Sequence, residues 1–459
     1  MGMFGALNSA VSGLRAQAFA MENISGNIAN SQTIGFKRID TTFADLVTGA
    51  GSSSKNQTSG MVLASSRSTN TVQGDIQASD NATYMAINGP GYFVVSSKIS
   101  ESDGNPVFSG FDLYTRRGDF ETDKSGYLVN GAGYYLKGLI VDPTTGNAAG
   151  SVPQVIQLSS DFLQAEPTTE VRYRANLPTV PFTSNYDPTV PNSELLDATG
   201  WATDPTAGGD GTVLGADESA FLGSTVSGYA ATMYNANGAP VSVQFRWAKI
   251  DSVANGGADT WNLFYQVSST ASPTDVAWQN VGTDYVFDTA GQLDPPITSL
   301  SLTGLTSNGI TVGDVTIDHG TGGITQYQDA NGSASLTTLS QNGSPSGQLV
   351  GVQVSDGGKV VANYSNGKSV TLALIPLATF NADGGLMRLD GGAYAATEES
   401  GNAIFSSGAG IVGQSLEASN TDIADEFSKL IVTQQAYSAN TRIISTADDM
   451  LKEILNIIR

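Results

Sequence analysis

The residues best suited to catalysis are few and scattered along this chain of 459 residues. His319 is the only histidine, so a Ser-His-Asp triad could form only around it. It stands between the strand-like run VTID and a glycine-rich turn, which predicts a histidine in a surface turn. Cysteine is absent, and this excludes thiol nucleophiles, cysteine-ligated metals and disulfides. The sequence therefore favours neither a triad nor a thiol site.

Three further patterns resemble binding or catalytic motifs only in part. The run from Gly408 to Gly413 matches G-x-G-x-x-G, but no second βα unit follows it, so a hinge is the better interpretation. The stretch 381–384 resembles part of a calcium loop without its spaced acidic ligands or final glutamate. Any two of the 43 acidic residues could form a glycosidase pair, yet no pair stands out. We therefore predict no catalytic residues, no cofactor-binding residues and no metal site.

A long apolar repeat dominates the C-terminal end. Steps of four and three from Ile423 give a heptad seam, interrupted by Gln434, Thr441 and Asp448. Neither Gly nor Pro occurs after Gly413, and Asn420 or Thr421 can cap the helix. Such a helix would be roughly 58 Å long and would extend beyond a small domain. A single long helix packed across a globular core is the alternative. The apolar seam residues are Ile423, Phe427, Leu430, Tyr437, Ile444, Leu451, Leu455 and Ile458.

A shorter copy of the same repeat occupies the N-terminal end. Gly13 and Gly26 weaken this helix by up to about 1 kcal/mol each relative to alanine. A weak helix and a strong one at the two termini are typical of partners in an antiparallel coiled coil. The polar interruptions of the long seam would then specify register or partner. The N-terminal residues that we expect to pack between subunits are Leu7, Val11, Leu14, Met21 and Ile28.

Composition excludes several classes of partner. The net charge is −22 and there is no basic cluster, so binding to nucleic acid or to an anionic membrane surface is disfavoured. No run of 18 apolar residues predicts membrane insertion, and the start of the chain lacks the basic and apolar regions of a cleaved signal peptide. Taken alone, the lack of a predicted signal peptide and of a membrane-spanning run would indicate a cytoplasmic protein.

Proline placement divides the chain. All 16 prolines lie between Pro90 and Pro376, so the middle is turn-rich and β-like while both ends are free to be helical. We predict a multidomain protein with terminal helices that pair as a coiled coil and all-β outer domains, one inserted in the other. The small polar run 48–60 is interpreted as a flexible connection. The predicted parts are 1–31 with 415–459 (helical), 32–72 (extended linker), 73–140 with 351–414 (discontinuous β domain) and 141–350 (inserted outer β domain or domains).

Five blocks of the sequence stand out: SGNIANSQTIGFKR at 25–38, INGPGYFVV at 87–95, YTRRGDFETDKSGYLVNGAGYYLKG at 114–138, YSNGK at 364–368 and SLEASNTDIADEF onward from 415. They resemble the rod and hook axial proteins of the bacterial flagellum, and they occur in family order. Gly26 departs from the pattern, since relatives more often have Asn there; this concerns only how the first helix ends. About 200 residues separate Gly138 from the YSNGK block, and this long insert favours the hook members over the shorter rod members.

The resemblance implies a structural function. A subunit of this kind would polymerise with itself into a curved tube that transmits torque from rod to filament. Its expected partners are further copies of itself, the rod, the hook cap, the hook–filament junction proteins and the flagellar type III export apparatus. It would lie outside the cell without a cleaved signal peptide, which reverses the cytoplasmic interpretation. The alternatives are a distal rod or other axial protein, and an extracellular β-rich enzyme or adhesin with oligomerising helices.

Overall fold

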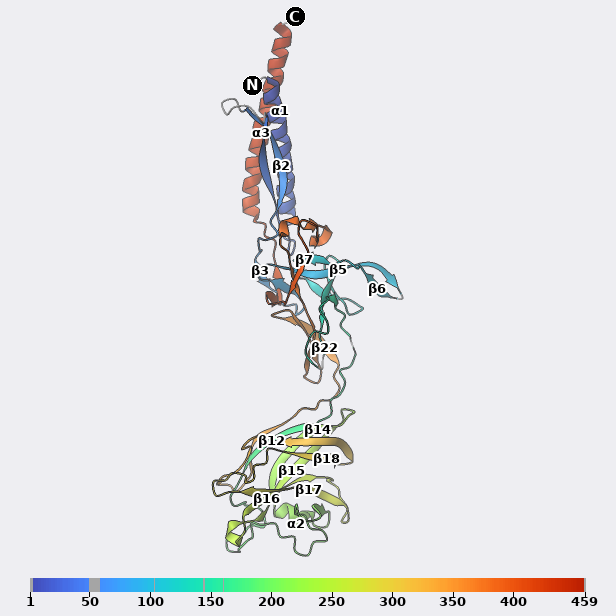
Figure 1. The fold of residues 1–459 in the computed structure, drawn as a ribbon, viewed down its shortest axis with the longest axis vertical. Coiled ribbons are helices and arrows are strands. Elements are labelled where there is room, and N and C mark those ends of the chain that lie inside the picture. The colour runs from blue at the N-terminus through green and yellow to red at the C-terminus, as the bar shows by residue number, and fades with distance from the viewer. Residues whose placement is uncertain (1–2, 49–57, 103, 143–144, 160, 458–459) are drawn as a thin grey trace. The chain divides into compact units, whose positions relative to one another are not determined.

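The computed structural model describes residues 3–48, 58–102, 104–142, 145–159 and 161–457 (Figure 1). The chain forms two compact units. Unit 1 comprises residues 1–160, 349–364 and 368–459, and unit 2 comprises residues 161–348 and 365–367.

The two long helices of unit 1 come from opposite ends of the chain. Helix α1 covers Met3–Ala29 and helix α3 covers Ile423–Ile457. They lie side by side and run in opposite directions (Figure 1). The α3 helix begins at a cap that the sequence did not predict, since the Asp422 carboxylate accepts the N–H groups of Ala424 and Asp425 at 2.8 and 3.2 Å. Its 35 residues span about 50 Å.

A β-hairpin packs against α1. Strands β1 (Ile39–Thr48) and β2 (Thr58–Ser68) pair antiparallel within the segment predicted as an extended linker. The Asn23 amide of α1 donates to Thr41 Oγ1 at 2.8 Å, and the Val62 N–H donates to Ser12 Oγ of α1 at 3.2 Å. Most of the predicted flexible connection, residues 49–57, lies outside the described residues.

The rest of unit 1 is a β region whose main sheet runs in the order β22-β23-β24-β10-β5-β7-β27-β26, with shorter strands beside this path. Its core gathers Phe93, Phe120, Leu136, Val360 and other apolar side chains from both halves of the chain. The strands of this region are β3 (Ile76–Ala78), β4 (Met85–Ile87), β5 (Tyr92–Ser102), β6 (Asn105–Phe108), β7 (Leu113–Thr115), β8 (Phe120–Thr122), β9 (Leu128–Asn130), β10 (Tyr134–Ile140), β11 (Gln154–Val155), β22 (Leu349–Ser355), β23 (Lys359–Tyr364), β24 (Ser369–Leu374), β25 (Leu377–Thr379), β26 (Met387–Arg388), β27 (Ala393–Ala395), β28 (Ile404–Ser406), β29 (Ile411–Gly413) and β30 (Ser415–Glu417).

The turns of this region follow one sequence rule. At 123–127 and at 130–134 an Asp or Asn side chain accepts the N–H groups two and four residues later, at 2.8–3.1 Å. A glycine three residues after it, Gly126 or Gly133, takes a positive φ that other residues adopt at a cost. Both turns lie in the middle of the chain, which the placement of proline predicted to be turn-rich.

The boundaries of the predicted β domains shift in two places. Residues 141–159 belong with unit 1 rather than with the insert, because β11 pairs with β10 and Ile156 and Leu158 fill the unit 1 core. Residues 415–417 form a strand paired with β3 instead of beginning the helix.

Unit 2 is a sandwich of two sheets, of which the first mixes parallel and antiparallel pairs and the second is antiparallel throughout. One sheet runs β18-β19-β12-β20 with β21 beside β12, and the other runs β13-β17-β16-β15-β14. Strand β12 alternates buried Val171, Tyr173 and Ala175 with exposed arginines, as expected for a strand covered on one face. The elements are β12 (Glu170–Leu177), β13 (Thr212–Leu214), α2 (Glu218–Gly223), β14 (Val226–Tyr234), β15 (Pro240–Asp251), β16 (Asp259–Gln266), β17 (Val276–Phe287), β18 (Ser299–Ser307), β19 (Ile310–Asp318), β20 (Ile324–Gln326) and β21 (Ser335–Gln341).

Candidate functional site

The contact between α1 and α3 is built from small and polar residues. Asn27 of α1 donates to Glu426 of α3 at 3.0 Å. Fourteen residues earlier, a Cβ on Gly13 would lie 2.8 Å from the amide nitrogen of Asn440, so glycine permits this close approach. Fourteen residues along α1 therefore correspond to fourteen residues in the opposite direction along α3. Midway between the two contacts, the buried residues Ala20 and Thr433 line the same groove.

Three of the predicted seam residues of α3 are exposed rather than buried in this contact. Ile423, Phe427 and Tyr437 are 40, 49 and 38% exposed, while Glu426, Thr433 and Ala447 are buried. The physical reason lies on α1, whose buried side consists of Ala10, Gly13, Ala16, Ala20, Ile24 and Asn27. Four of these six residues are alanine or glycine, so the face admits a partner helix closely and leaves little room for large apolar side chains of α3.

The remaining predicted seam residues are only partly buried in the single chain. Those of α1 lie beside its buried face rather than on it. The side chain of Leu455 and the whole of Ile458 lie outside what the structure describes. The partly buried set is Leu7, Val11, Leu14, Met21, Ile28, Leu430, Ile444 and Leu451.

Asn27 joins three elements at the lower end of the helix pair. Its amide donates to the Ile39 carbonyl and accepts from the Ile39 N–H, both at 2.9 Å, while it also donates to Glu426. Lys429 donates to the other Glu426 oxygen at 2.8 Å. Asn27 and Glu426 are 2 and 0% exposed, so each buried polar group has a partner, as burial demands.

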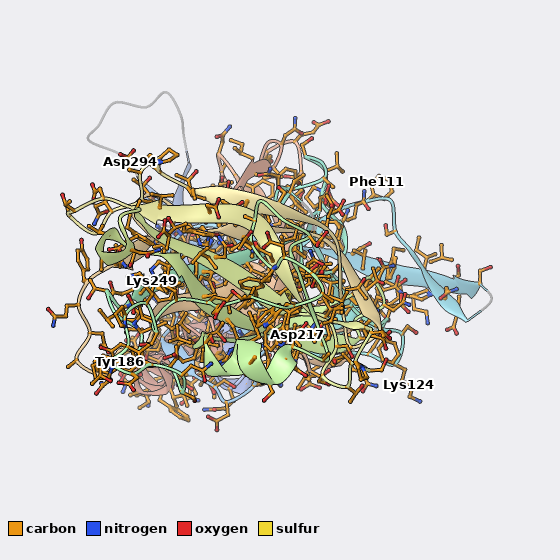
Figure 2. All side chains as sticks on the ribbon, turned by 90° about the horizontal axis from the view of Figure 1, so that it is seen from below. Phe111, Lys124, Tyr186, Asp217, Lys249 and Asp294 are labelled. Carbon is orange, nitrogen blue, oxygen red and sulfur yellow. The ribbon has the colours of Figure 1, made fainter. Side chains whose placement is uncertain are left out.

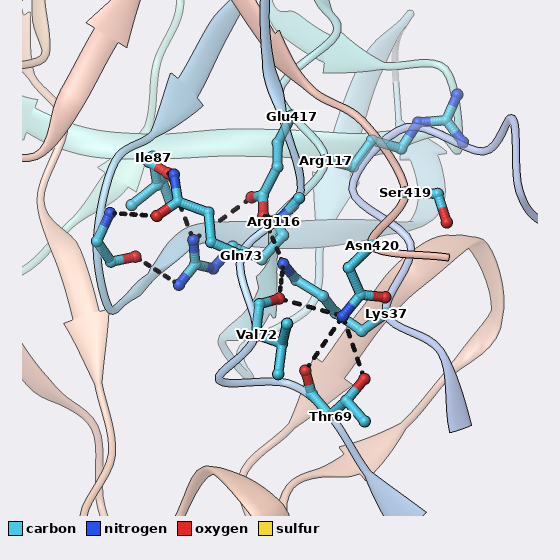
Figure 3. A network of polar contacts seen from close by, with 12 residues as sticks. Lys37, Thr69, Val72, Gln73, Ile87, Arg116, Arg117, Glu417, Ser419 and Asn420 are labelled. Atoms are coloured by element: carbon cyan, nitrogen blue, oxygen red, sulfur yellow. Dashed lines mark hydrogen bonds and ion pairs between the residues drawn. The ribbon is translucent and has the colours of Figure 1, made fainter. Parts of the chain in front are cut away.

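Below the helices, a buried ion cluster ties both chain ends to the β region (Figure 3). Lys37, which follows α1, forms an ion pair with Glu417, which precedes α3. Arg116, which follows β7, approaches the other Glu417 oxygen at 3.4 Å. Lys37 also donates to the Val72 carbonyl at 2.7 Å, and Arg116 donates to the Gly89 carbonyl at 2.8 Å.

The electrostatics of the cluster are those of a buried anion between two cations. Lys37 and Glu417 have fully buried side chains, and Arg116 is nearly so. Burial lowers the pKa of Lys37, and the adjacent Glu417 carboxylate opposes that shift. Burial likewise raises the pKa of Tyr92, over whose ring the Arg116 guanidinium lies at 5.4 Å. Removing one member of such a buried set leaves uncompensated charge.

Asn420 secures the entry to α3 rather than capping it. Its side-chain oxygen accepts the Arg38 N–H at 2.8 Å, and its amide donates to Thr69 Oγ1 and to the Val72 carbonyl at 3.2 and 3.1 Å. The Arg388 guanidinium donates to the Lys37 carbonyl at 3.0 Å and stacks over the Phe36 ring. The paths of the chain into and out of the helix pair are therefore fixed by side chains.

Sequence reasoning missed Lys37, Arg116 and Glu417. They are separated by up to 380 positions, so no local periodicity connects them. A usable signal was present, because each lies inside a block that carried the family resemblance: GFKR, YTRRGDF and SLEASN.

His319 corrects an expectation, since it is fully buried in unit 2 and not in a surface turn. Its Nε2 lies 2.9 Å from the Tyr285 hydroxyl, and its Nδ1 lies 2.8 Å from the Tyr173 carbonyl. The carbonyl can only accept, so Nδ1 carries the proton and Nε2 accepts from Tyr285. Burial lowers the pKa of His319, which keeps the ring neutral as a core member.

Within the described residues, no group of three or more His, Cys, Asp or Glu side chains is arranged to hold a metal ion. None of the described helices is both long and apolar enough to cross a membrane.

Three family models match the chain, and all describe flagellar axial proteins. Residues 7–37 match the flagella basal body rod protein, residues 86–161 match the flagellar hook protein FlgE/F/G D1 domain, and residues 412–457 match the flagellar basal body rod FlgEFG protein C-terminal region. These three segments contain Asn27 and Lys37, Arg116, and Glu417 and Glu426 respectively. All three models therefore indicate the rod and hook proteins of the flagellum as the class to which these segments are similar.

Relatives that match over the full length narrow this class. The flagellar hook protein FlgE of Brucella suis biovar 1 (strain 1330) is 30% identical, with 100% of both chains covered. That of Caulobacter vibrioides is 28% identical over 100% of both chains, and that of Salmonella typhimurium is 29% identical over 98% of this chain and 99% of its own. The chain belongs to the flagellar hook protein family, whose members are structural proteins and not enzymes.

A solved structure, the crystal structure of Helicobacter pylori flagellar hook protein FlgE2, aligns with a TM-score of 0.46 and 16% identity. It covers 74% of this chain and 99% of its own, and no argument below rests on it.

Proposed function

We propose that this chain is the subunit of the flagellar hook and that it polymerises into a tube through its terminal helices. One observation carries the proposal: α3 leaves several large apolar side chains exposed on the sides that α1 does not cover. Phe427, Ile431 and Val432 are 49, 55 and 65% exposed. Further along the helix, Ile443 and Met450 are 46 and 56% exposed. Exposed apolar side chains spread along most of a helix indicate contact with another protein. Further copies of the same helix pair meet that need.

The predicted seam residues are assigned to contacts between subunits, and the contact within the subunit to other residues. We propose that α1 and α3 form an antiparallel coiled coil within the subunit through Asn27, Thr433 and their neighbours. The predicted residues Ile423, Phe427, Leu430, Tyr437, Ile444 and Leu451 would pack between subunits, together with the partly buried apolar side chains of α1. The small α1 face leaves these larger groups available for neighbours, which supports this assignment.

The buried ion cluster gives the subunit a mechanical connection. Torque that acts on the packed helices must reach the β region through the segments 30–38 and 415–422. Lys37, Glu417 and Asn420 hold both segments to the β region by side-chain contacts that water does not reach or reaches only in part. Rotation of the helices relative to the β region would break these contacts, so we propose that they transmit force.

Unit 2 is proposed to be an independently folding insert that faces neighbouring subunits at the outer surface. It holds 19 of the 43 acidic residues but only four of the 21 basic ones, so it carries most of the net negative charge. Like charge on adjacent copies opposes tight packing. This supports compliant outer contacts, which a curved rotating tube requires as each subunit lengthens and shortens.

All four tryptophans lie in unit 2, at 201, 247, 261 and 278, so their fluorescence reports on that unit alone. Replacing residues 164–346 by a short Gly-Ser linker should remove this fluorescence and leave a cooperatively melting remainder. A remainder without cooperative melting would contradict the independence of the two units.

The location and the partners follow from the proposed polymer. The subunit would lie outside the cell in the hook, between rod and filament, after export by the flagellar type III apparatus without a cleaved signal peptide. Its neighbours would be the rod, the hook cap and the hook–filament junction proteins. Sedimentation tests the assembly step: the full chain should pellet as polymer above a critical concentration, whereas a chain ending at residue 418 should remain soluble. Equal pelleting of both would contradict assembly through α3.

A further inference from the structure

Strands β5 and β6 extend beyond the main sheet as a two-stranded ribbon, which points away from the rest of the β region of unit 1 (Figure 1). The outer parts of both strands carry exposed apolar side chains. Ile99 is 67% exposed and Val107 is 41% exposed. Phe111, at the base of the ribbon, is 82% exposed (Figure 2). A lone ribbon is marginally stable in water, and its outer edges have unpaired backbone groups.

The base of the ribbon is nevertheless firmly held. The Phe108 ring lies edge-on to the rings of Tyr127 and Tyr135, at centroid distances of 5.3 and 4.9 Å. The Ser109 N–H donates to the Ser97 carbonyl at 2.9 Å, and beyond Phe111 the Asp112 carboxylate pairs with Lys137. These contacts fix the direction of the ribbon and keep Phe111 in water, so the exposed phenyl ring is not the product of a loose loop.

The edge strand β22 of unit 1 provides a surface on which such a ribbon could bind. Strand β22 ends the main sheet and, among the described residues, pairs only with β23. Beside it lies a groove of about 420 Å³ lined by Leu158, Val350 and Val352 together with the 122–126 turn. Val350 is 72% exposed. The Val354 N–H donates to the Ala82 carbonyl at 2.8 Å, so the edge of β22 is open only towards Val350 and Val352. An open strand edge beside a groove with apolar side chains is a surface onto which an extended segment adds as a further strand.

We propose that the ribbon of one subunit docks on the β22 edge of a second copy of this chain, so that Phe111 and Ile99 are buried against Val350 and Val352. This inference rests on the proposed polymerisation. Contact between two different patches propagates into an open polymer, whereas ribbon-to-ribbon pairing would be self-complementary and would close as a dimer. The docking adds backbone pairing between β regions to the contacts of the terminal helices.

The absence of native cysteine makes the test direct. Polymer assembled from equal amounts of Phe111→Cys and Val350→Cys chains is oxidised and analysed by non-reducing electrophoresis. We expect a mixed disulfide dimer. The control pairs Phe111→Cys with Ile404→Cys, another half-exposed site on unit 1, and should give none. Polymer in which the first pair does not cross-link, or in which Phe111→Cys mainly cross-links to itself, would overturn the proposed docking.

A second measurement does not depend on cysteine. The double variant Ile99→Ser/Phe111→Ser should raise the critical concentration about tenfold or more, because two large apolar groups lose their burial. Its thermal melting as a dilute chain should be unchanged, since both side chains are already in water. An unchanged critical concentration would overturn the inference. Failure of the unmodified chain to polymerise at all would instead refute the proposed function, and this inference with it.

Discussion

The amide of Asn27 and the carboxylate of Glu426 lie 3.0 Å apart across the helix pair, although 399 positions separate them in the chain. The same asparagine closes two hydrogen bonds with the backbone of Ile39 at the start of the hairpin. A shift of one helix by a single turn would break this bond and leave one N–H of Asn27 and one oxygen of Glu426 buried without a partner. This pair therefore sets the register between α1, α3 and β1.

Asn27→Ala tests the register pair. The substitution leaves the Ile39 backbone and one Glu426 oxygen without their buried partner, which costs about 1–3 kcal/mol. Because polymerisation is proposed to need the correct register, the critical concentration should rise correspondingly. Asn8→Ala, at an exposed position of the same helix, is the matched control and should have little effect. Similar values for the two variants would argue against a register role.

Phe427→Ala tests whether the exposed apolar side chains of α3 form contacts between subunits. Phe427 is half exposed in the single chain, so its loss should barely change the folding of a dilute subunit. If neighbouring subunits cover it, truncation should weaken assembly by about 3–5 kcal/mol when fully packed. Gln435→Ala, exposed on the same helix, should change assembly little. The account fails here if light scattering gives the same critical concentration for Phe427→Ala as for the unmodified chain.

The two terminal helices and the turn-rich middle of the chain were predictable because their signals are local. Caps, heptads and Asx-Gly turns act over fewer than eight residues. The choice of helix face was not predictable in this way. Large apolar residues such as Phe427 were assumed to face the partner helix, but Ala16 and Ala20 on α1 favour the small and polar side of α3. In a subunit that polymerises, the most apolar side of a helix can contact neighbouring subunits instead of the partner helix in the same chain.

The buried polar sites eluded sequence reasoning for a related reason. His319 looked like a surface turn because its partners, Tyr285 and Tyr173, come from other strands. Lys37 and Glu417 approach each other only after both helices and the β region are in place. In both sites the residues that meet are far apart in the sequence, so no regular spacing in the sequence indicates the contact.

Glu417→Gln tests the ion cluster. It leaves Lys37 and Arg116 as two buried cations without their counter-ion, and breaking a buried pair costs about 3–5 kcal/mol. Unit 1 should therefore melt earlier by calorimetry, while the tryptophan-reported transition of unit 2 stays unchanged. Adding Lys37→Met should recover part of the loss, because one uncompensated cation is removed. The exposed control Glu453→Gln should be neutral, and a Glu417 variant as stable as that control would contradict the force-bearing role.

His319 predicts a pH dependence of unit 2. Burial lowers its pKa in the folded state below the usual value of about 6.5, so the unfolded chain binds the proton first. The resulting stability is complete above about pH 6.5 and falls as the pH drops towards the folded-state pKa. Asp318 opposes this shift, and Arg174 contacts only the His319 carbonyl.

Tryptophan-monitored unfolding at pH 7.5 and pH 5.5 measures this effect. The unmodified chain should lose stability at the lower pH, and His319→Gln, which cannot titrate, should show a smaller change. Equal changes in both proteins would assign the pH dependence to other groups.

Electron cryomicroscopy of the concentrated full-length protein tests the central claim most directly. The account predicts hollow tubes in which α1 and α3 surround the channel and the side chains of Phe427, Ile431 and Ile443 are buried against neighbouring subunits. Closed oligomers, or tubes in which this stripe of α3 remains in contact with solvent, would contradict it.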